Sequence, residues 1–326
     1  MKYDLITIGG ATEDVTLHTD EGVIIDNKDD VLRQKLLAFE YGAKINITHS
    51  KATYGGGAAN VAVASSLLGL RSSAIVAVGD DDRGDRIISN LAARGVNIAL
   101  IQRIKNFDSG LSFLVVGQGN EHVVFSSRGA NSFLTINDKA CENIKKSEWV
   151  YITSLSGRWS QTLSKVFKIG PKKIAWNPGH VQLKSGVKDL VRYLKKTDVL
   201  IFNKDEAIEL AMSDEKGEKK SPEYFNEIGN LLRVIKSYGP KIVIITNGSF
   251  GAHAFDGEND YYQPVIKEKK RVDTTGVGDA FGASFVSGMV IYNGDIKKSL
   301  LLAAKNTASA VGKEGAQNGL LTKKDI

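Results

Sequence analysis

Near the C-terminal end of the chain, one segment combines the residue types needed to move a phosphoryl group. It reads DTTGVGDAFGASF from Asp273 to Phe285, a turn of threonines and glycines that runs into an apolar helical pattern. Gly276 and Gly278 allow the backbone to turn so that several N–H groups point the same way, and at a helix N-terminus such a group binds phosphate. Asp279 would lie in the first helical turn, where the helix dipole favours the carboxylate form. This carboxylate could be the base for a hydroxyl that attacks a phosphoryl group, although a simple helix cap explains the pattern equally well.

A second glycine-rich segment, GGGAANVAVA at 55–64, also leads into a predicted helix. Its three glycines would let another group approach the backbone closely, but tight packing of the helix on a sheet explains them equally well. The segment lacks the Lys-Ser/Thr pair of a P-loop and does not have the spacing of the dinucleotide-binding fingerprint. That absence argues against an oxidoreductase built on a Rossmann-type sheet.

These segments need a scaffold, and the chain predicts an α/β fold with a doubly wound, mostly parallel sheet and helices on both faces. Short runs rich in isoleucine and valine, typical of strands buried on both faces, alternate with stretches of helical period. The strand runs are 4–8, 73–78, 149–152, 173–176, 198–202 and 242–245, and the helical stretches are 58–68, 85–94, 160–167, 188–195 and 225–238. Glycine and polar residues follow the ends of most of these runs, which predicts a ligand site at the carboxyl edge of the sheet. We expect a single domain over residues 1–326.

Two regions interrupt the alternation, at about 15–53 and 96–125. The second contains short β-like runs at 99–103, 111–116 and 122–125 joined by turn residues, which predicts an antiparallel appendage inserted in the main domain. At the active edge of a sheet such an appendage would act as a small β lid. A plain surface insertion or a contact between two subunits is the alternative.

Composition excludes several classes of protein. The 326 residues are 42% hydrophobic and carry a net charge of +6, with the basic residues scattered along the chain. Scattered lysines are typical of solvated surfaces, so we expect no nucleic-acid partner, and no apolar run reaches the ~18–20 residues of a membrane span. The single cysteine, Cys141, cannot form an internal disulfide, and together with an N-terminus that is no signal peptide it favours a reducing, cytoplasmic location. The five histidines have no metal-ligand spacing.

Taken together, the segments at 55–64 and 273–285 resemble the two signatures of the ribokinase-like (PfkB) family of carbohydrate kinases. Val277 stands where that family usually has alanine in Gly-Ala-Gly-Asp, a change that leaves the backbone amides in place. Asn203 to Glu206 is similar to the family's Asn-x-x-Glu motif, and 245–251 resembles its nucleotide-binding strand and turn. Asp14, shortly after a Gly-Gly pair, matches an acceptor-binding aspartate. The resemblance spans nearly the whole chain and implies the ribokinase-like fold with its β lid.

The resemblance also implies a role for individual residues. Asp279 would be the catalytic base, with the amides of Gly276, Val277 and Gly278 around the transferred phosphoryl group. The acceptor would be bound by Asp14, Gly56, Gly57 and Asn60, and the nucleotide by Asn203, Thr246, Gly248, Gly251 and Asn306. Glu206 would act on Mg²⁺ mostly through water, because Mg²⁺ gives up its hydration shell reluctantly. Asp273 and Thr275, with backbone near Gly312 and Gly315, could form a site for a monovalent cation such as K⁺, as in some relatives.

The expected activity is therefore ATP-dependent phosphorylation of a hydroxyl on a small sugar of the ribose, fructose or keto-sugar-acid type. A nucleoside acceptor is the alternative, because Phe39, Tyr41, Phe113 and Phe125 lie in or near the predicted lid, where aromatic rings could contact a base. An alternative of another class is a non-catalytic nucleotide-binding regulator. Arg128 could meet an acidic sugar or a phosphate, or could equally be a surface arginine. A homodimer through the lid is a further expectation from the family.

Overall fold

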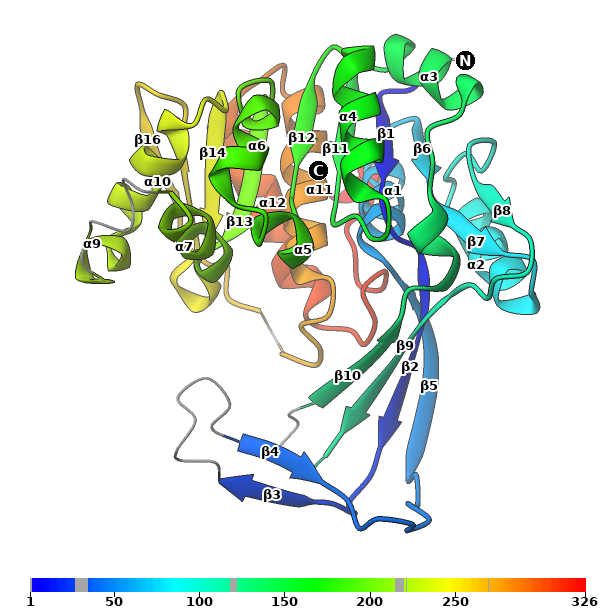
Figure 1. Ribbon diagram of the computed structural model, residues 1–326. Helices are drawn as coiled ribbons and strands as arrows, with labels where there is room; N and C mark the ends of the chain where they lie inside the picture. Colours follow the sequence, from blue (N-terminus) through cyan, green and yellow to red (C-terminus); the bar gives the residue numbers. More distant parts are fainter. Residues whose placement is uncertain (1, 27–34, 118–121, 215–219, 221, 269) are drawn as a thin grey trace.

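The computed structural model describes residues 2–26, 35–117, 122–214, 220, 222–268 and 270–326 (Figure 1). Its centre is an eight-stranded sheet with the order β16-β15-β14-β13-β12-β11-β1-β6. The strands are β1 (Leu5–Ile8), β6 (Ser72–Ile75), β11 (Trp149–Ile152), β12 (Ile174–Trp176), β13 (Val199–Asn203), β14 (Ile242–Thr246), β15 (Ala252–Phe255) and β16 (Asp260–Gln263). The strands from β6 to β14 pair in parallel, and β15 and β16 add an antiparallel edge. The predicted doubly wound, mostly parallel sheet is confirmed.

Helices cover both faces of this sheet (Figure 1). One face carries α3 (Asp138–Lys146), α4 (Trp159–Ile169), α5 (His180–Leu183), α6 (Gly186–Leu194), α7 (Lys204–Met212) and α10 (Ile228–Ser237), with α9 (Pro222–Asn226) beside α10. The other face carries α1 (Gly57–Leu67), α11 (Val277–Ile291) and α12 (Ile296–Ala310), with α2 (Asp82–Ala93) packed beside α1. Short 3-10 turns are η1 (Gly129–Phe133), η2 (Gly248–Phe250) and η3 (Lys323–Asp325).

Strand β11 shows why the strand sequences are almost continuously apolar. Val150 and Ile152 pack into the core beneath α4 and α6, whereas Trp149 and Tyr151 pack into the core beneath α11. Side chains alternate between the two faces of a strand, so a strand covered on both faces needs apolar residues at every position. All four residues of β11 are buried.

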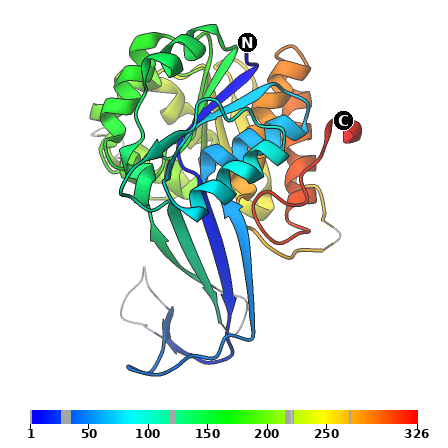
Figure 2. The same ribbon diagram turned by 90° about the vertical axis from the view of Figure 1, so that its right-hand side faces the viewer.

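The lid is a separate four-stranded sheet that projects from the carboxyl edge of the main sheet (Figures 1 and 2). Its order is β10-β9-β2-β5, formed by β2 (Thr12–His18), β5 (His49–Gly55), β9 (Gly110–Val116) and β10 (His122–Ser127). A hairpin of β3 (Val23–Asp26) and β4 (Lys35–Ala38) extends its far end. The first lid segment therefore begins at Thr12, three residues earlier than predicted.

The second lid segment needs a larger correction. Its first predicted β-like run, around 99–103, does not belong to the lid, because β8 (Gln102–Ile104) pairs in parallel with β7 (Ala77–Gly79) beside the main domain. The lid part begins only at Gly110. No helix in the described part of the chain is both long and apolar enough to cross a membrane.

Candidate active site

The turn before α11 forms an open group of backbone amides. Gly276 is the N-cap of the helix with a φ of 73°, a left-handed conformation that glycine adopts without strain, and a Cβ there would collide with Ala316. Among the described residues, the amides of Gly276, Gly278 and Asp279 have no hydrogen-bond partner, whereas the amide of Val277 donates to the carbonyl of Thr274 at 3.3 Å. The turn thus presents free amides where we predicted an anion hole, with the Asp279 amide in the place that we assigned to Val277.

Asp279 lies in the first turn of α11 and is held from α1. Its Oδ2 accepts a hydrogen bond from Nδ2 of Asn60 at 2.8 Å, and the helix has no side-chain cap, so the simple capping explanation does not apply. Burial raises the pKa of Asp279, the hydrogen bond from Asn60 opposes the rise, and the charge of Asp14 adds to it. A carboxylate with a raised pKa is a better base at neutral pH than an exposed aspartate.

A cavity of about 250 Å³ lies between the lid and this turn. It is lined by Asp14, Ser112, Leu114, Val124, Thr274 and Thr275. Asp14 is buried, and its Oδ1 accepts a hydrogen bond from the Thr12 hydroxyl at 3.0 Å. Burial raises its pKa, hydrogen bonds from Ser112 and Thr12 oppose this, and the charge of Asp273 adds to the rise. The position of Asp14 in this cavity fits the predicted contact with acceptor hydroxyls.

The glycine run at 55–57 serves close packing. Gly56 has a φ of 89°, and a Cβ there would lie 2.6 Å from the backbone of Ala11. A Cβ on Gly57 would lie 2.9 Å from Thr153, and a Cβ on Gly55 would occupy the place of the Asp14 carboxylate. Neither Gly56 nor Gly57 lines the cavity beneath the lid. These glycines allow β5 and α1 to approach Asp14, and their contact with the acceptor stays a prediction.

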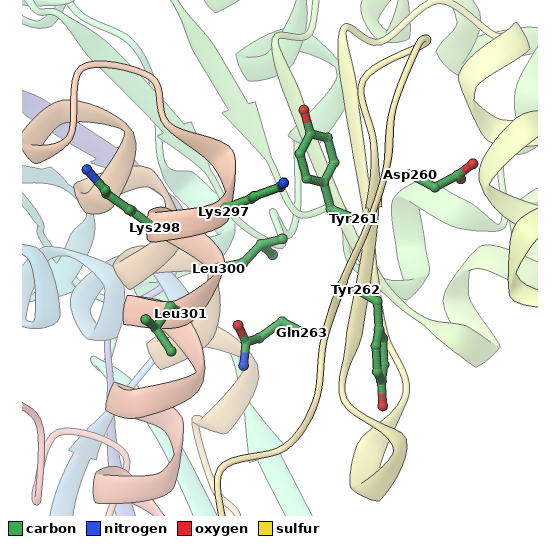
Figure 3. A pocket seen from close by; sticks show the side chains of 8 residues that line it. All are labelled: Asp260, Tyr261, Tyr262, Gln263, Lys297, Lys298, Leu300 and Leu301. Atoms are coloured by element: carbon green, nitrogen blue, oxygen red, sulfur yellow. The ribbon is translucent and has the colours of Figure 1, made fainter.

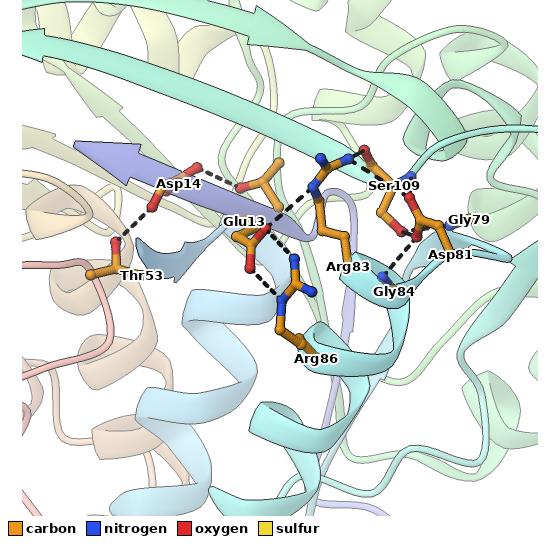
Figure 4. Close-up of polar contacts among 10 residues, drawn as sticks. Glu13, Asp14, Thr53, Gly79, Asp81, Arg83, Gly84, Arg86 and Ser109 are labelled. Carbon is orange, nitrogen blue, oxygen red and sulfur yellow. Dashed lines mark hydrogen bonds and ion pairs between the residues drawn. The ribbon is translucent and has the colours of Figure 1, made fainter. Parts of the chain in front are cut away.

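The base of the lid is fastened to α2 by an ion-pair cluster that the sequence analysis missed (Figure 4). Glu13, next to Asp14 on β2, is buried and accepts from Arg86 at 2.8 and 2.9 Å and from Arg83 at 3.3 Å. The hydrogen bond from Arg86 lowers the pKa of Glu13. Arg83 also donates to the carbonyl of Ser109, just before β9. The spacing of the two arginines, three apart on a helix, was the available signal.

A second cavity, of about 410 Å³, lies on the other side of the same turn. Four predicted nucleotide-binding residues line it: Asn203, Thr246, Gly248 and Gly251. Its other lining residues include Thr274, Val277, Gly278 and Phe281 from the turn and α11, and Ala304, Thr307, Ala308 and Val311 from α12 and its end. Thr274 lines both cavities, so both border the turn before α11.

The prediction for Asn306 is wrong. Its side chain is fully buried, donates to the Ser284 hydroxyl at 2.6 Å and accepts from the Leu321 amide at 2.7 Å, so it holds α12 to α11 and the C-terminal segment. The neighbouring Thr307 lines the nucleotide cavity instead, and its hydroxyl is buried without a partner among the described residues. The sequence alone could not tell Asn306 from Thr307 as the residue at the cavity, because that depends on how α12 is rotated about its axis.

Asn203 and Glu206 form a reciprocal cap at the start of α7. The Asn203 amide donates to Glu206 Oε2 at 2.9 Å, and the Glu206 amide donates to Asn203 Oδ1 at 2.8 Å. Burial raises the pKa of Glu206, and the charges of Glu209, Asp205 and Asp279 raise it further. In the described part of the chain no three acidic, histidine or cysteine side chains are grouped to hold a metal ion. A single carboxylate fits a Mg²⁺ ion that keeps most of its water and phosphate ligands.

Asp273 connects two loops. Its Oδ1 accepts from the Thr275 amide at 2.8 Å, and its Oδ2 accepts from the Gly315 amide at 2.8 Å. The structure therefore brings Asp273, Thr275 and Gly315 together, as predicted for a cation site. Both carboxylate oxygens already accept hydrogen bonds that fix the turn before α11 against the C-terminal loop.

Two further features lie outside this arrangement. Arg128 is exposed at the start of η1 and lines neither cavity, and its side chain has no hydrogen bond or ion pair among the described residues. A separate cavity of about 400 Å³ lies between β16 and α12 (Figure 3). It is lined by Asp260, Tyr261, Tyr262, Gln263, Lys297, Lys298, Leu300 and Leu301. It contains no predicted site residue.

Comparison with known proteins decides which reaction this geometry serves. The family profile for pfkB family carbohydrate kinases matches residues 24–323. The chain belongs to this family. It is therefore an ATP-dependent sugar or nucleoside kinase.

Individual relatives match most of the length of this kinase. A ribokinase of Dictyostelium discoideum is 29% identical over 289 residues, which cover 85% of this chain and 89% of the relative. The structure of Arabidopsis thaliana ribokinase complexed with ribose and ATP superposes with a TM-score of 0.80 at 21% identity, covering 99% of this kinase and 97% of that chain. The Methanocaldococcus jannaschii nucleoside kinase superposes with a TM-score of 0.76 at 23% identity, covering 99% and 96%. These structural matches show the ribokinase fold.

Proposed function

We propose that this kinase transfers the γ-phosphoryl group of ATP to a hydroxyl of a small sugar of the ribose, fructose or keto-sugar-acid type, with Asp279 as the base. The observation that carries the proposal is that two cavities border one turn, with Thr274 in the lining of both. The larger cavity contains the residues predicted for the nucleotide, and the smaller contains Asp14. The free amides at the start of α11 belong to the same turn, so they could stabilise a phosphoryl group that is transferred between ligands in the two cavities.

Each residue then has a defined part in the transfer. Asp14 orients the sugar so that one hydroxyl faces Asp279, which accepts the hydroxyl proton as the oxygen–phosphorus bond forms. The bond to the β-phosphate oxygen breaks, and ADP leaves. The amides of Gly276, Gly278 and Asp279 stabilise the negative charge on the transferred group. Mg²⁺, bound with the nucleotide near Glu206, would neutralise phosphate charge.

The lid favours a sugar over a nucleoside. Phe125 pairs with Phe113 across β10 and β9, and Val124 pairs with Leu114. Adjacent residues of a strand point to opposite faces, and the cavity is lined by Leu114 and Val124. The two phenylalanines therefore belong to the outer face, where they cannot stack on a base in this cavity.

A nucleoside remains the second candidate because a nucleoside kinase shares the fold over nearly the full chain. A regulator without turnover is disfavoured by the Asp279 carboxylate, since a protein that only binds nucleotide would not need a base beside an anion hole.

K⁺ near Asp273 is also part of the proposal, and its test is the dependence of turnover on K⁺ compared with Na⁺.

The outer face of the lid supports the proposed homodimer. Phe113, Val123 and Phe125 are 39%, 39% and 58% exposed on one face of the lid sheet. A second copy of this chain that covers them would remove apolar surface from water. Phe125→Glu should shift the mass measured by sedimentation from dimer to monomer. A monomer mass for the wild type would contradict the dimer, and a dimer mass for the variant would contradict this interface.

The decisive experiment measures ADP release from Mg·ATP with a panel of pentoses, hexoses, keto-sugar acids and nucleosides. Asp279→Asn is the matched control, since it keeps the size and the contact with Asn60 but cannot take a proton. We expect one class of sugar to stimulate ADP release, with a loss of at least about 10³-fold in the variant. Stimulation by nucleosides alone would establish the second candidate, and unchanged turnover of Asp279→Asn would remove it as the base.

A further inference from the structure

Three side-chain amides form a continuous chain that ends on Asp279. Asn60 Nδ2 donates to Asp279 Oδ2 at 2.8 Å, Gln317 Nε2 donates to Asn60 Oδ1 at 3.0 Å, and Asn90 Nδ2 donates to Gln317 Oε1 at 2.7 Å. We call Asn60, Gln317 and Asn90 the amide chain. Its members come from α1, the C-terminal loop and α2, three parts of the fold that are distant in sequence.

The carboxylate forces the direction of every bond in this chain. An ionised carboxylate only accepts, so Asn60 must present its NH₂ group to Asp279 and its oxygen to Gln317. Gln317 must then present its own NH₂ group to Asn60 and its oxygen to Asn90. Asn60 and Gln317 are only 5% and 3% exposed, so water cannot easily replace a missing partner. A reversed amide at any position would place two oxygens against each other.

The surroundings of Asp279 explain why an oriented donor matters. The charged and titratable groups that act on it or are affected by it are Asp14 on β2, Glu206 on α7 and Tyr151 on β11. None of these is a cation. Asn60 is thus the side chain that stabilises the ionised form of Asp279. Because Asn60 binds Oδ2 of Asp279, the second carboxylate oxygen, Oδ1, is left for the acceptor.

We propose that Gln317 and Asn90 are positioning residues for phosphoryl transfer, because they hold the Asn60 amide in the one orientation that stabilises and aims the Asp279 carboxylate. The inference rests on the proposed role of Asp279 as the base. It adds two residues, neither of which lines a substrate cavity, to the apparatus that controls the reaction.

The C-terminal loop offers a matched control one residue away. Asn318 Oδ1 accepts from Arg94 at 3.0 Å, and its amide donates to the Glu314 carbonyl at 2.8 Å. Asn318 therefore fastens the same loop to the same helix α2 without touching Asn60. Gln317→Leu is compared with Asn318→Leu, and Gln317→Glu is compared with Asn318→Asp, which adds the same charge outside the amide chain.

The test reads the Asp279 carboxyl directly by carbon-13 NMR of the full chain, with the resonance assigned by its absence in Asp279→Asn. We expect both Gln317 variants to raise the pKa of Asp279 by about one unit, a tenfold change in its ionisation equilibrium, because Asn60 loses its fixed orientation. Both Asn318 variants should titrate like the wild type. Thermal melts confirm that each variant is folded, and Gln317→Glu, which keeps size and polarity, serves if Gln317→Leu does not fold.

Two results would overturn the inference. One is an unchanged Asp279 titration in the Gln317 variants, and the other is an equal shift in the Asn318 variants, which would show a general effect of the loop. The NMR titration needs no acceptor, so its outcome can be distinguished from a failure of the proposed function. That failure would appear as undiminished turnover in Asp279→Asn. With ribose as the probe, kcat should fall about tenfold in Gln317→Leu while the KM for ATP is retained.

Discussion

Asn60 and Asp279 are joined by a 2.8 Å hydrogen bond although 219 positions separate them in the sequence. The bond connects the glycine-rich segment that opens α1 with the glycine turn that opens α11. Both helices pack on the same face of the sheet, side by side. The two signatures that the sequence presents at opposite ends of the chain are therefore one site.

Neutralising Asp279 should stabilise the protein at neutral pH. The pKa of Asp279 is raised in the folded state, so the folded protein binds this proton more tightly than the unfolded chain. The cost of ionisation is absent below the unfolded pKa of ~3.9 and grows as pH rises through the folded pKa. For Asp279→Asn we expect the free energy of unfolding to rise by about 1 kcal/mol at pH 7, which corresponds to a rise in Tm of roughly 2 °C. This gain should disappear towards pH 4. Equal melting temperatures of variant and wild type across this range would contradict the raised pKa.

Asp14→Asn should affect the acceptor and the pH profile together. The loss of a charged hydrogen-bonding partner should raise the KM of the acceptor by about 10- to 100-fold, with little change for ATP. The charge of Asp14 also raises the pKa of Asp279, so the acid limb of the kcat profile should move to lower pH in the variant. Steady-state kinetics from pH 4.5 to 8, with the first active sugar of the panel, measure both effects. An acceptor KM equal to that of the wild type would place the acceptor elsewhere.

Gly276 and Gly278 provide a matched pair in the anion hole. Gly276→Ala forces a residue with a side chain into a φ of 73° and against Ala316, so we expect a loss of about 1–3 kcal/mol of stability and weaker ATP binding. A Cβ on Gly278 would meet nothing within 4 Å, so Gly278→Ala should keep its stability within about 0.5 kcal/mol. Urea unfolding and calorimetric ATP titration compare the two. Equal losses of stability would mean that the turn does not need its left-handed residue.

Thr307 and Asn306 separate nucleotide binding from packing. Thr307→Val removes a buried hydroxyl, unpartnered among the described residues, from a side chain that lines the nucleotide cavity, so ATP should bind about 3- to 10-fold more weakly while Tm is retained. Asn306→Ala removes the bonds to Ser284 and Leu321 and should lower stability by about 1–3 kcal/mol. The same calorimetric and thermal measurements serve both variants. A larger effect on ATP from Asn306→Ala than from Thr307→Val would restore the original sequence-based assignment.

Much of the fold could be predicted because its signals are local. Each of the six predicted strand runs is a strand of the structure, with the run at 73–78 divided into β6 and β7. A strand buried on both faces needs apolar residues throughout, and this pattern can be read without knowing its neighbours. The run at 99–103, which became β8, was wrongly predicted to belong to the lid. Strand pairing depends on contacts distant in sequence, and β propensity does not indicate which strand the partner is.

The family, the sheet and the segments at its carboxyl edge could be predicted from the sequence, because each depends on glycine positions, apolar periodicity or a contiguous motif. The role of Asp279 as the base was predicted from a carboxylate in the first turn after two glycines together with the family resemblance. The folded chain was needed to show which amides are free, that Thr307 rather than Asn306 lines the nucleotide cavity, and that Gln317 and Asn90 are linked by hydrogen bonds to Asn60. These depend on helix rotation and on hydrogen bonds between segments up to 257 positions apart, and such distances leave no mark in a single sequence.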